Sequence, residues 1–189
     1  NANDLPYGFL TMLEERLAKV ELAVDEGEGL ILRNKIFIDR LKDVGILPRE
    51  RAIEHGFTGP MLRATGVPYD VRRADPYLVY PELDFEIPVG TVGDCFDRFL
   101  VRQEEIRQSI RIVRQAVEQL PPGDFHCRDR RVWMPDKYEV FNSIEGLIDH
   151  FKIVMDGPQP PPGEAYQAVE GGNGELGFYC ISDGSGTAY

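Results

Sequence analysis

The sequence predicts a mainly α-helical chain with one small β-hairpin, an α+β fold arranged around a long central helix. Residues 94–120 keep one helical period of apolar side chains without interruption. Shorter helical periods precede and follow them, and near the C-terminal end a glycine-rich turn separates two runs that predict strands. We therefore expect a helical bundle core over residues 1–157 and a β-hairpin segment over residues 158–189 that continues beyond this fragment.

The central helix carries its own start and stop signals. Asp94 precedes the first apolar residue, where the positive end of the helix dipole favours an acid. Pro121, Pro122 and Gly123 cannot continue a helix. The apolar face is formed by Phe96, Phe99, Leu100, Ile106, Ile110, Val113, Val117 and Leu120. At about 1.5 Å per residue the helix is roughly 40 Å long, so we expect other elements to pack against it.

Arginines flank this apolar face. Arg98 and Arg102 lie one turn apart, as do Arg107 and Arg111, and like charges at this spacing repel weakly when exposed. One interpretation is that these side chains bond to acids on other elements or on a partner chain. The other is a solvated face with loose ion pairs, each of which contributes only ~0–1 kcal/mol.

The segments before the central helix predict shorter elements. Apolar periods predict helices over 6–25 and 30–41, with a break at Gly27 and Gly29, because a helical glycine costs about 1 kcal/mol relative to alanine. Short helices are expected over 48–54 and 58–66. Residues 67–92 contain four prolines and predict an extended connection with one short strand near 83–87.

The segments after the central helix predict a loop, a helix and a hairpin. Residues 121–135 are polar, and Asn142 or Ser143 is expected to cap a helix that ends near Met155. A proline-rich spacer follows. Residues 164–170 and 175–182 then predict two strands joined by the glycine-rich turn.

Composition excludes several classes of function. The chain has 189 residues and a formal net charge of −11, whereas binding to nucleic acid needs a basic surface. No apolar run approaches the ~20 residues of a membrane-spanning helix. Three widely spaced cysteines, Cys95, Cys127 and Cys180, argue against a disulfide framework and for a reducing compartment.

Candidate catalytic motifs are weak. Residues 172–177 spell G-x-G-x-x-G, but that motif binds a dinucleotide only at the start of a helix, and here a strand is expected to follow. His126 and Cys127 lack the spacing of a metal site, and His55 and His150 are expected to be structural. The residues alone therefore predict no catalytic, cofactor-binding or metal-binding site.

Ten short blocks, taken together and in order, resemble one family. They include LPYG at 5–8, GPMLRATG at 59–66 and GDCFDR at 93–98. The full set lies at residues 4–8, 59–67, 72–77, 83–90, 93–102, 107–115, 149–152, 162–166, 174–179 and 182–185. The series resembles a central fragment of the 49 kDa subunit of respiratory complex I, the proton-pumping NADH:quinone oxidoreductase.

The resemblance implies an incomplete helical bundle of the NiFe-hydrogenase large-subunit fold. It implies a part of the quinone-reducing module, a scaffold of the peripheral arm near the quinone site, in an enzyme complex that acts as an NADH:quinone translocase. The isolated fragment is expected to be inactive and to hold no cofactor: quinone is the substrate of the parent subunit, and the nearest iron–sulfur cluster belongs to the adjacent subunit. The implied partners are other peripheral-arm subunits, especially the one that carries the terminal cluster. The implied location is peripheral, on the cytoplasmic side of the bacterial inner membrane or the mitochondrial matrix side.

The resemblance places the quinone ligands outside this fragment, so it gives no catalytic residue here. It does single out six charges that recur in the matching blocks as structural or interface charges: Arg63, Arg72, Arg73, Asp94, Arg98 and Arg102. For Arg72 and Arg73, the plain alternative is a self-paired surface cluster with Asp70 and Asp75. Two other functions stay open at this point, a fragment of a membrane-bound NiFe-hydrogenase subunit and a non-catalytic interaction module.

Overall fold

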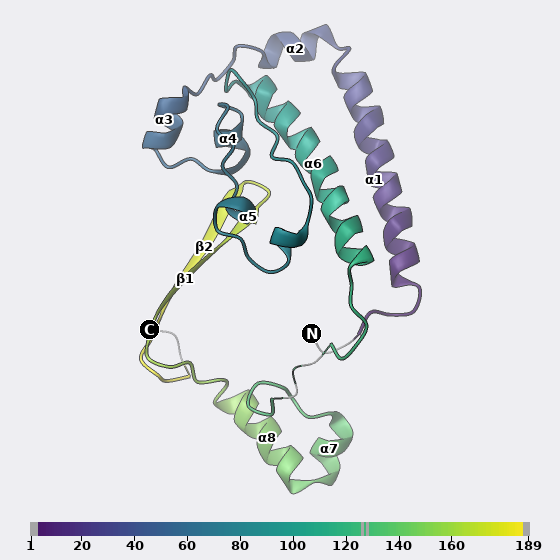
Figure 1. The fold of residues 1–189 in the computed structure, drawn as a ribbon, viewed down its shortest axis with the longest axis vertical. Coiled ribbons are helices and arrows are strands. Elements are labelled where there is room, and N and C mark those ends of the chain that lie inside the picture. The colour runs from purple at the N-terminus through teal and green to yellow at the C-terminus, as the bar shows by residue number, and fades with distance from the viewer. Residues whose placement is uncertain (1–3, 126, 128, 187–189) are drawn as a thin grey trace. The chain divides into compact units, whose positions relative to one another are not determined.

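The computed structural model describes residues 4–125, 127 and 129–186 (Figure 1). In that part of the chain it has helices and a two-stranded antiparallel hairpin, which confirms the expected mainly α, α+β class. The elements are α1 (Phe9–Ile31), α2 (Lys35–Leu41), α3 (Arg49–Glu54), α4 (Gly59–Arg63), α5 (Val71–Ala74), the 3-10 turn η1 (Tyr80–Glu82), α6 (Cys95–Glu118), α7 (Lys137–Asn142), α8 (Ile144–Met155), β1 (Gly163–Gly171) and β2 (Gly174–Ser182).

The chain forms two compact units. The α6 unit comprises residues 7–120 and the hairpin tip, residues 168–177. The α8 unit comprises the described residues of 1–6, 121–167 and 178–189. Each unit therefore contains residues from the expected helical part, 1–157, and from the expected hairpin segment, 158–189.

The long central helix is confirmed as α6, and its start is fixed by two aspartates. Asp94 caps the helix, since its Oδ1 accepts the backbone N–H of Asp97 at 2.7 Å. Asp97 Oδ2 accepts the N–H groups of Thr91, Val92 and Gly93. Burial alone would raise the pKa of Asp97, but these backbone hydrogen bonds outweigh it and lower the pKa. The preceding turn is thereby tied to the helix.

Arginines on the later part of α6 bond to acids on other elements, which confirms the first interpretation for Arg107 and Arg111. Arg98 and Arg102 instead donate to backbone carbonyl oxygens. The pairs are Arg107 with Asp25 and Glu28, Arg111 with Asp84, and Arg114 with Glu14 and Glu21. Four of these five acids lie on α1, which packs along α6 (Figure 1). The pairs are partly solvated, so they set the pairing of the two helices more than they add stability.

The break expected at Gly27 and Gly29 is wrong. Helix α1 continues through both glycines to Ile31, and the chain breaks instead at residues 32–34. There Asn34 caps α2, because its Oδ1 accepts the N–H groups of Ile36 and Phe37. A local cost of about 1 kcal/mol per glycine is too small to end a helix that has tertiary support, whereas a side-chain cap defines a new start.

The strand expected near 83–87 is also wrong, although that segment is extended. Its backbone bonds to side chains of α6: the N–H of Asp84 donates to Gln115 Oε1 at 2.8 Å, and the N–H of Glu86 donates to Gln108 Oε1 at 3.0 Å. Gln115 Nε2 in turn donates to the carbonyl oxygen of Asp84 at 2.6 Å. Two glutamines thus take the place of a neighbouring strand. They hold Leu83 and Phe85 in a small core cluster.

The α8 unit contains one helix that the sequence analysis missed. Helix α7 is capped by Asp136, whose Oδ1 accepts the N–H of Glu139 at 2.9 Å. Helix α8 follows directly, with Ser143 as its cap, so the second of the two expected caps is the right one. The hairpin has the expected strands and turn, and the G-x-G-x-x-G sequence lies in that turn and in β2. The prediction that this motif is a hairpin is therefore confirmed.

Candidate functional site

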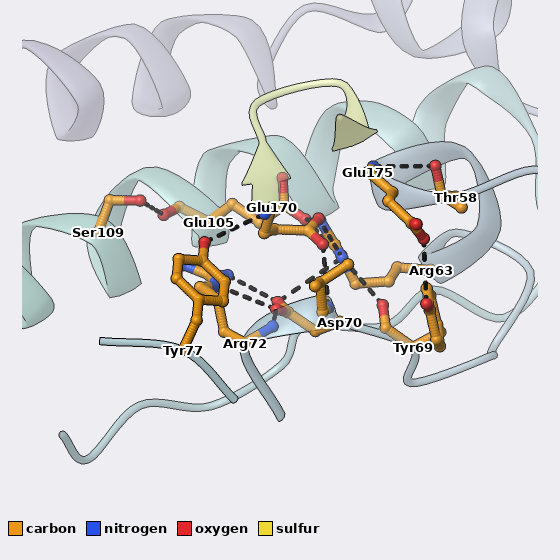
Figure 2. A network of polar contacts seen from close by, with 11 residues as sticks. Thr58, Arg63, Tyr69, Asp70, Arg72, Tyr77, Glu105, Ser109, Glu170 and Glu175 are labelled. Atoms are coloured by element: carbon orange, nitrogen blue, oxygen red, sulfur yellow. Dashed lines mark hydrogen bonds and ion pairs between the residues drawn. The ribbon is translucent and has the colours of Figure 1, made fainter. Parts of the chain in front are cut away.

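Arg63 is the centre of the densest polar cluster among the described residues. It ends α4, and its side chain is only 2% exposed. Its Nε donates to Glu105 Oε1 at 2.6 Å, and one terminal nitrogen donates to Glu170 Oε1 at 2.8 Å (Figure 2). The same nitrogen donates to the carbonyl oxygen of Tyr69 at 2.9 Å and lies 3.7 Å from Asp70 Oδ2. One planar guanidinium therefore joins α4, α6 and β1.

Glu170 is the second junction of this cluster. Its side chain is buried, with Oε1 on Arg63 and Oε2 accepting the backbone N–H of Val71 at 3.1 Å. Its own backbone N–H donates to the hydroxyl oxygen of Tyr77 at 3.1 Å. A single residue at the end of β1 thus bonds to α4, to the start of α5 and to the loop before η1, which fixes the position of the hairpin tip in the α6 unit.

Arg72 and Asp70 complete the group, which we call the Arg63 cluster: Arg63, Asp70, Arg72, Glu105 and Glu170. Arg72 donates to Asp70 through Nε at 2.9 Å and through a terminal nitrogen at 2.7 Å, a two-point pair. Burial would raise the pKa of Asp70, but the hydrogen bonds and charge of Arg72 outweigh it and lower the pKa. Burial likewise disfavours the charged Arg72, yet its bond to Asp70 raises its pKa.

The two adjacent arginines also pack against one aromatic ring. The guanidinium carbon of Arg72 lies 4.8 Å from the centroid of the Phe85 ring, and that of Arg73 lies 4.2 Å from it. Arg73 also donates to the carbonyl oxygen of Phe85 at 3.0 Å. Arg72 is paired with Asp70, whereas Arg73 is held by the backbone and ring of the 83–87 segment.

The turn of the hairpin lies tightly against the start of α4. The backbone N–H of Glu175 donates to Thr58 Oγ1 at 3.0 Å, and the hydroxyl of Tyr69 donates to Glu175 Oε2 at 3.1 Å (Figure 2). Gly59 has a φ of +63°, and a Cβ built there would lie 2.4 Å from the Cα of Gly174. Only glycine combines this conformation with so close a backbone approach.

Among the carboxylates of the Arg63 cluster, Glu105 is the one whose charged form is disfavoured by its surroundings. The cluster holds three carboxylates and two guanidiniums, and Asp70 already has Arg72. Burial raises the pKa of Glu105, although the nearby charge of Arg63 partly offsets it. Glu105 and Arg102 both border a cavity of about 520 Å³, which is also lined by Arg63 and Arg72 and by residues of α1, α6, η1 and the hairpin tip.

The other expected charges gather at the start of α6, apart from the Arg63 cluster. Asp94 is buried, and its Oδ2 accepts the backbone N–H of Asp43 at 2.8 Å. Arg98 is also buried and donates to the carbonyl oxygens of Gly93 and Gly45 at 2.9 and 2.8 Å. Arg102 donates to the carbonyl oxygen of Arg98 at 3.1 Å. The structure thus places Arg63 and Arg72 in the Arg63 cluster and Arg73 beside it on Phe85, whereas Asp94 and Arg98 lie at the start of α6. Arg102, one turn after Arg98, borders the same cavity as Arg63 and Arg72.

The sequence analysis named Asp70 as a partner of Arg72, and the structure has that pair, although it is buried and not on the surface. It missed the two glutamates of the Arg63 cluster. Glu105 and Glu170 lie 42 and 107 positions from Arg63 along the chain, so no local spacing connects them. In the sequence Asp70 stands beside two arginines as if in a surface cluster. A usable signal is the position of Glu170 and Glu175, one on either side of the glycine-rich turn.

The described residues show neither a metal centre nor a membrane helix. No three of their His, Cys, Asp or Glu side chains are placed to hold a metal ion. None of the helices described is long and apolar enough to span a bilayer. Cys95, Cys127 and Cys180 are all free thiols. What the described residues do show is a helical chain in which charged side chains join separate elements: Arg63 joins α4 to α6 and β1, and Asp94 and Arg98 join residues 43–45 to the start of α6.

Comparison with known proteins places this chain in one family. Residues 1–189 match the family described as "Respiratory-chain NADH dehydrogenase, 49 Kd subunit", and the chain belongs to it. It is 55% identical over 188 residues to the second D-type subunit of the NADH-quinone oxidoreductase of Anaeromyxobacter sp. (strain Fw109-5), covering 100% of this chain and 44% of that relative.

Two further relatives agree. The chain is 56% identical over 182 residues to the first D-type subunit of the NADH-quinone oxidoreductase of Sorangium cellulosum, covering 96% of this chain and 45% of the relative. It is 52% identical over 186 residues to the corresponding subunit of Myxococcus xanthus, covering 98% and 45%. The chain thus spans somewhat less than half the length of these relatives. The expected membership of the 49 kDa subunit family is confirmed.

Proposed function

We propose that this chain is part of the quinone-reducing module of a proton-pumping NADH:quinone oxidoreductase and forms a scaffold of the peripheral arm near the quinone site. The observation that carries the proposal is the family match, which covers every residue from 1 to 189. The α6 unit supports a scaffold role, because its buried charged side chains form hydrogen bonds with backbone carbonyls, with backbone N–H groups and with one another.

In this proposal the six charges that recur in the family blocks are structural or interface charges. Arg63 holds the hairpin tip to α6, Arg72 pairs with Asp70 at the start of α5, and Arg73 bonds to the 83–87 segment. Asp94 and Arg98 hold residues 43–45 to the start of α6. Arg102 lies beside the cavity and is partly exposed, and we assign it the interface role, a contact with an acidic side chain of a neighbouring subunit. Rigid elements of this kind position a redox partner more closely than loops do.

The proposal includes the fold and the cofactors of the whole complex. We infer the helical bundle of the NiFe-hydrogenase large subunit, of which this chain holds an incomplete part. We infer that this region holds no cofactor of its own, that quinone is the substrate of the parent subunit, and that the terminal iron–sulfur cluster, the flavin and NAD belong to other subunits. The cluster-bearing subunit is then a direct partner. The location is peripheral, on the cytoplasmic side of a bacterial inner membrane or on the matrix side in a mitochondrion.

The test separates assembly from chemistry. Arg63→Lys in the full-length 49 kDa subunit keeps the positive charge but loses the planar fork that Glu105 and Glu170 share. A scaffold role predicts less assembled complex, with NADH:quinone activity and KM for quinone per assembled complex within about twofold of wild type. NADH oxidation by an artificial acceptor that bypasses quinone should fall in the same proportion as assembly. Normal assembly with a loss of about tenfold confined to quinone reduction contradicts the scaffold role.

The two other functions are less well supported. The relatives compared above are named as NADH-quinone oxidoreductase subunits, and none of them is named as a hydrogenase. An interaction module without a redox role would not explain a match that extends over all residues to a respiratory family.

A further inference from the structure

Helix α8 exposes its apolar face to solvent, although the apolar face of an amphipathic helix is normally buried. Six apolar side chains recur at helical spacing along one side, and we call them the α8 stripe: Ile144, Leu147, Ile148, Phe151, Val154 and Met155. Each of them is between 45% and 74% exposed. Isolated apolar side chains on a surface need no explanation, but a continuous stripe of this kind marks an interaction site.

The side of α8 that is covered is the polar side. Gly146 is buried against α7, and a Cβ built there would lie 2.7 Å from the carbonyl oxygen of Glu139. Arg130 bonds to Glu139 at 2.6 Å and to Asp149 at 3.3 Å, so an ion-pair network closes this side. At about 100° per residue, Gly146 lies roughly 160° around the helix from Ile144 and away from the stripe. Helix α7 therefore cannot cover the stripe from where it packs.

The chemistry of the flanks favours a protein partner over a lipid surface. Helices that lie on membranes carry lysines and arginines along the polar face. On α8 the charges that flank the stripe are Glu145 and Lys152, with Asp156 at the cap, a net acidic set that contains a single basic residue; Asp149 lies on the covered side with Arg130. An acidic flank is repelled by anionic lipid. Aromatic and branched aliphatic side chains on one face instead fit the groove between other helices of a bundle.

The length of the relatives indicates which protein covers the stripe. The matched region accounts for 44% to 45% of the three relatives described above, so more than half of each full-length relative lies outside it. A helix with one apolar stripe is stable in a domain only when another layer buries that stripe. We propose that the α8 stripe packs against the part of the 49 kDa subunit outside the matched region, as an intrasubunit interface. This rests on family membership and not on the proposed redox role.

The experiment measures thiol accessibility along α8. Leu147→Cys and Phe151→Cys report on the stripe, and Glu145→Cys, on the same helix, is the matched control. The variants are made in a background in which the native cysteines are replaced by serine or alanine. Ala52→Cys, at a position that is 0% exposed, reports whether the α6 unit of each preparation is folded. Far-ultraviolet circular dichroism of each stripe variant, compared with Glu145→Cys, reports whether α8 keeps its helix. Rates of reaction with a hydrophilic maleimide are compared for the 189-residue chain and for a full-length 49 kDa subunit in which these residues replace the matched region of the Anaeromyxobacter relative.

The expected result is protection that depends on the rest of the subunit. In the isolated chain, the stripe cysteines should react within about threefold of Glu145→Cys, and in the full-length subunit at least about tenfold more slowly, with Glu145→Cys unchanged. Only preparations in which Ala52→Cys is protected are compared.

Four other outcomes overturn the proposal. Equal labelling in both proteins means that the stripe is not an intrasubunit interface. If the stripe cysteines are already protected in the isolated chain and the protection depends on protein concentration, a second copy of the chain covers the stripe. If the protection does not depend on concentration, other residues of the same chain cover it. Protection that needs the other subunits assigns the stripe to a partner subunit. Protection that needs vesicles of anionic phospholipid assigns it to the membrane. None of these results depends on quinone reduction, which is tested separately by Arg63→Lys.

Discussion

Removing the guanidinium of Arg63 should be the most destabilising single change in the α6 unit. In Arg63→Met, Glu170 and Glu105 lose their short ion pairs at 2.8 and 2.6 Å, while Asp70 keeps Arg72. Arg63 is 2% exposed and Glu170 is 3% exposed, so water cannot replace the lost partner. Breaking a buried pair by removing one partner costs about 3–5 kcal/mol, and we expect a loss in that range. The backbone carbonyl of Tyr69 also loses a donor.

The assay is urea unfolding of the 189-residue chain, followed by far-ultraviolet circular dichroism. Arg131→Met is the matched control: its side chain is 87% exposed and pairs with Asp129 on the surface, so no measurable change is expected. Arg63→Lys should lie between the control and Arg63→Met. Adding Glu105→Gln and Glu170→Gln to Arg63→Met should recover part of the loss, because the amides carry no buried charge.

The pH dependence gives a second, independent reading. The pKa of Glu105 is raised by burial even with Arg63 present, and without Arg63 the pKa of Glu105 should rise further. A carboxyl whose pKa is higher in the folded state stabilises the fold below its unfolded pKa and loses that contribution as pH rises through the folded pKa. The deficit of Arg63→Met should therefore be smaller near about pH 5 than near about pH 8. If Arg63→Met matches Arg131→Met, or if the two added amides recover nothing, the buried-charge reasoning is refuted.

Other substitutions test the turn, the helix start and the glutamine contacts, each by the same unfolding measurement. Gly59→Ala should destabilise by more than about 1 kcal/mol, because the φ of Gly59 is positive and the added Cβ would meet Gly174. Gly27→Ala is the matched control and should stabilise by up to about 1 kcal/mol, because its added Cβ has nothing within 4 Å. Equal effects of the two substitutions would refute this account. Asp97→Asn should cost about 1–3 kcal/mol at neutral pH through weaker acceptance of three backbone N–H groups. Since the folded pKa of Asp97 is lowered, its contribution is present above the unfolded pKa and lost as pH falls through the folded pKa, so the deficit should vanish in acid; a deficit independent of pH would contradict this. Gln108→Leu should cost about 1–3 kcal/mol by leaving a backbone N–H of the 83–87 segment without its acceptor, and no cost would show that this segment is held by its apolar side chains alone.

Elements with strong local signals could be predicted from the sequence. The apolar period and the aspartate cap indicate α6 almost to the residue, and the glycine turn between two β-forming runs indicates the hairpin. The conformation of residues 83–87, where a strand was wrongly expected, depends on partners that are distant in the sequence. The backbone N–H groups of this segment donate to Gln108 and Gln115 of α6 and not to a neighbouring strand, and the local sequence pattern does not reveal these acceptors.

The arginines of the site and one nearby acid could be predicted from the sequence. The family blocks draw attention to Arg63, Arg72 and Arg73, and Asp70 lies two residues from Arg72, with which it pairs. The two glutamates that bond to Arg63 come from the middle of α6 and from the end of β1, and an acid on a long polar helix resembles any solvated charge. A helix period gives the face on which Glu105 lies, but not which loop will reach it. The pairing becomes visible only when the tertiary fold is known.

The composition of the hairpin tip explains why a charge cluster, and not an apolar core, holds it. The turn between Glu170 and Glu175 contains three glycines and one asparagine, which have almost no apolar surface to bury. Buried ion pairs seldom stabilise a fold more than apolar packing would, but they do specify one arrangement. Side chains alternate along a strand, so a slip of one residue would turn Glu170 away from Arg63 and move buried Ala168 off the same face. The Arg63 cluster therefore sets the register of the hairpin on α6. In a subunit proposed to hold a redox partner in place, a single defined position of the hairpin on α6 matters more than additional stability.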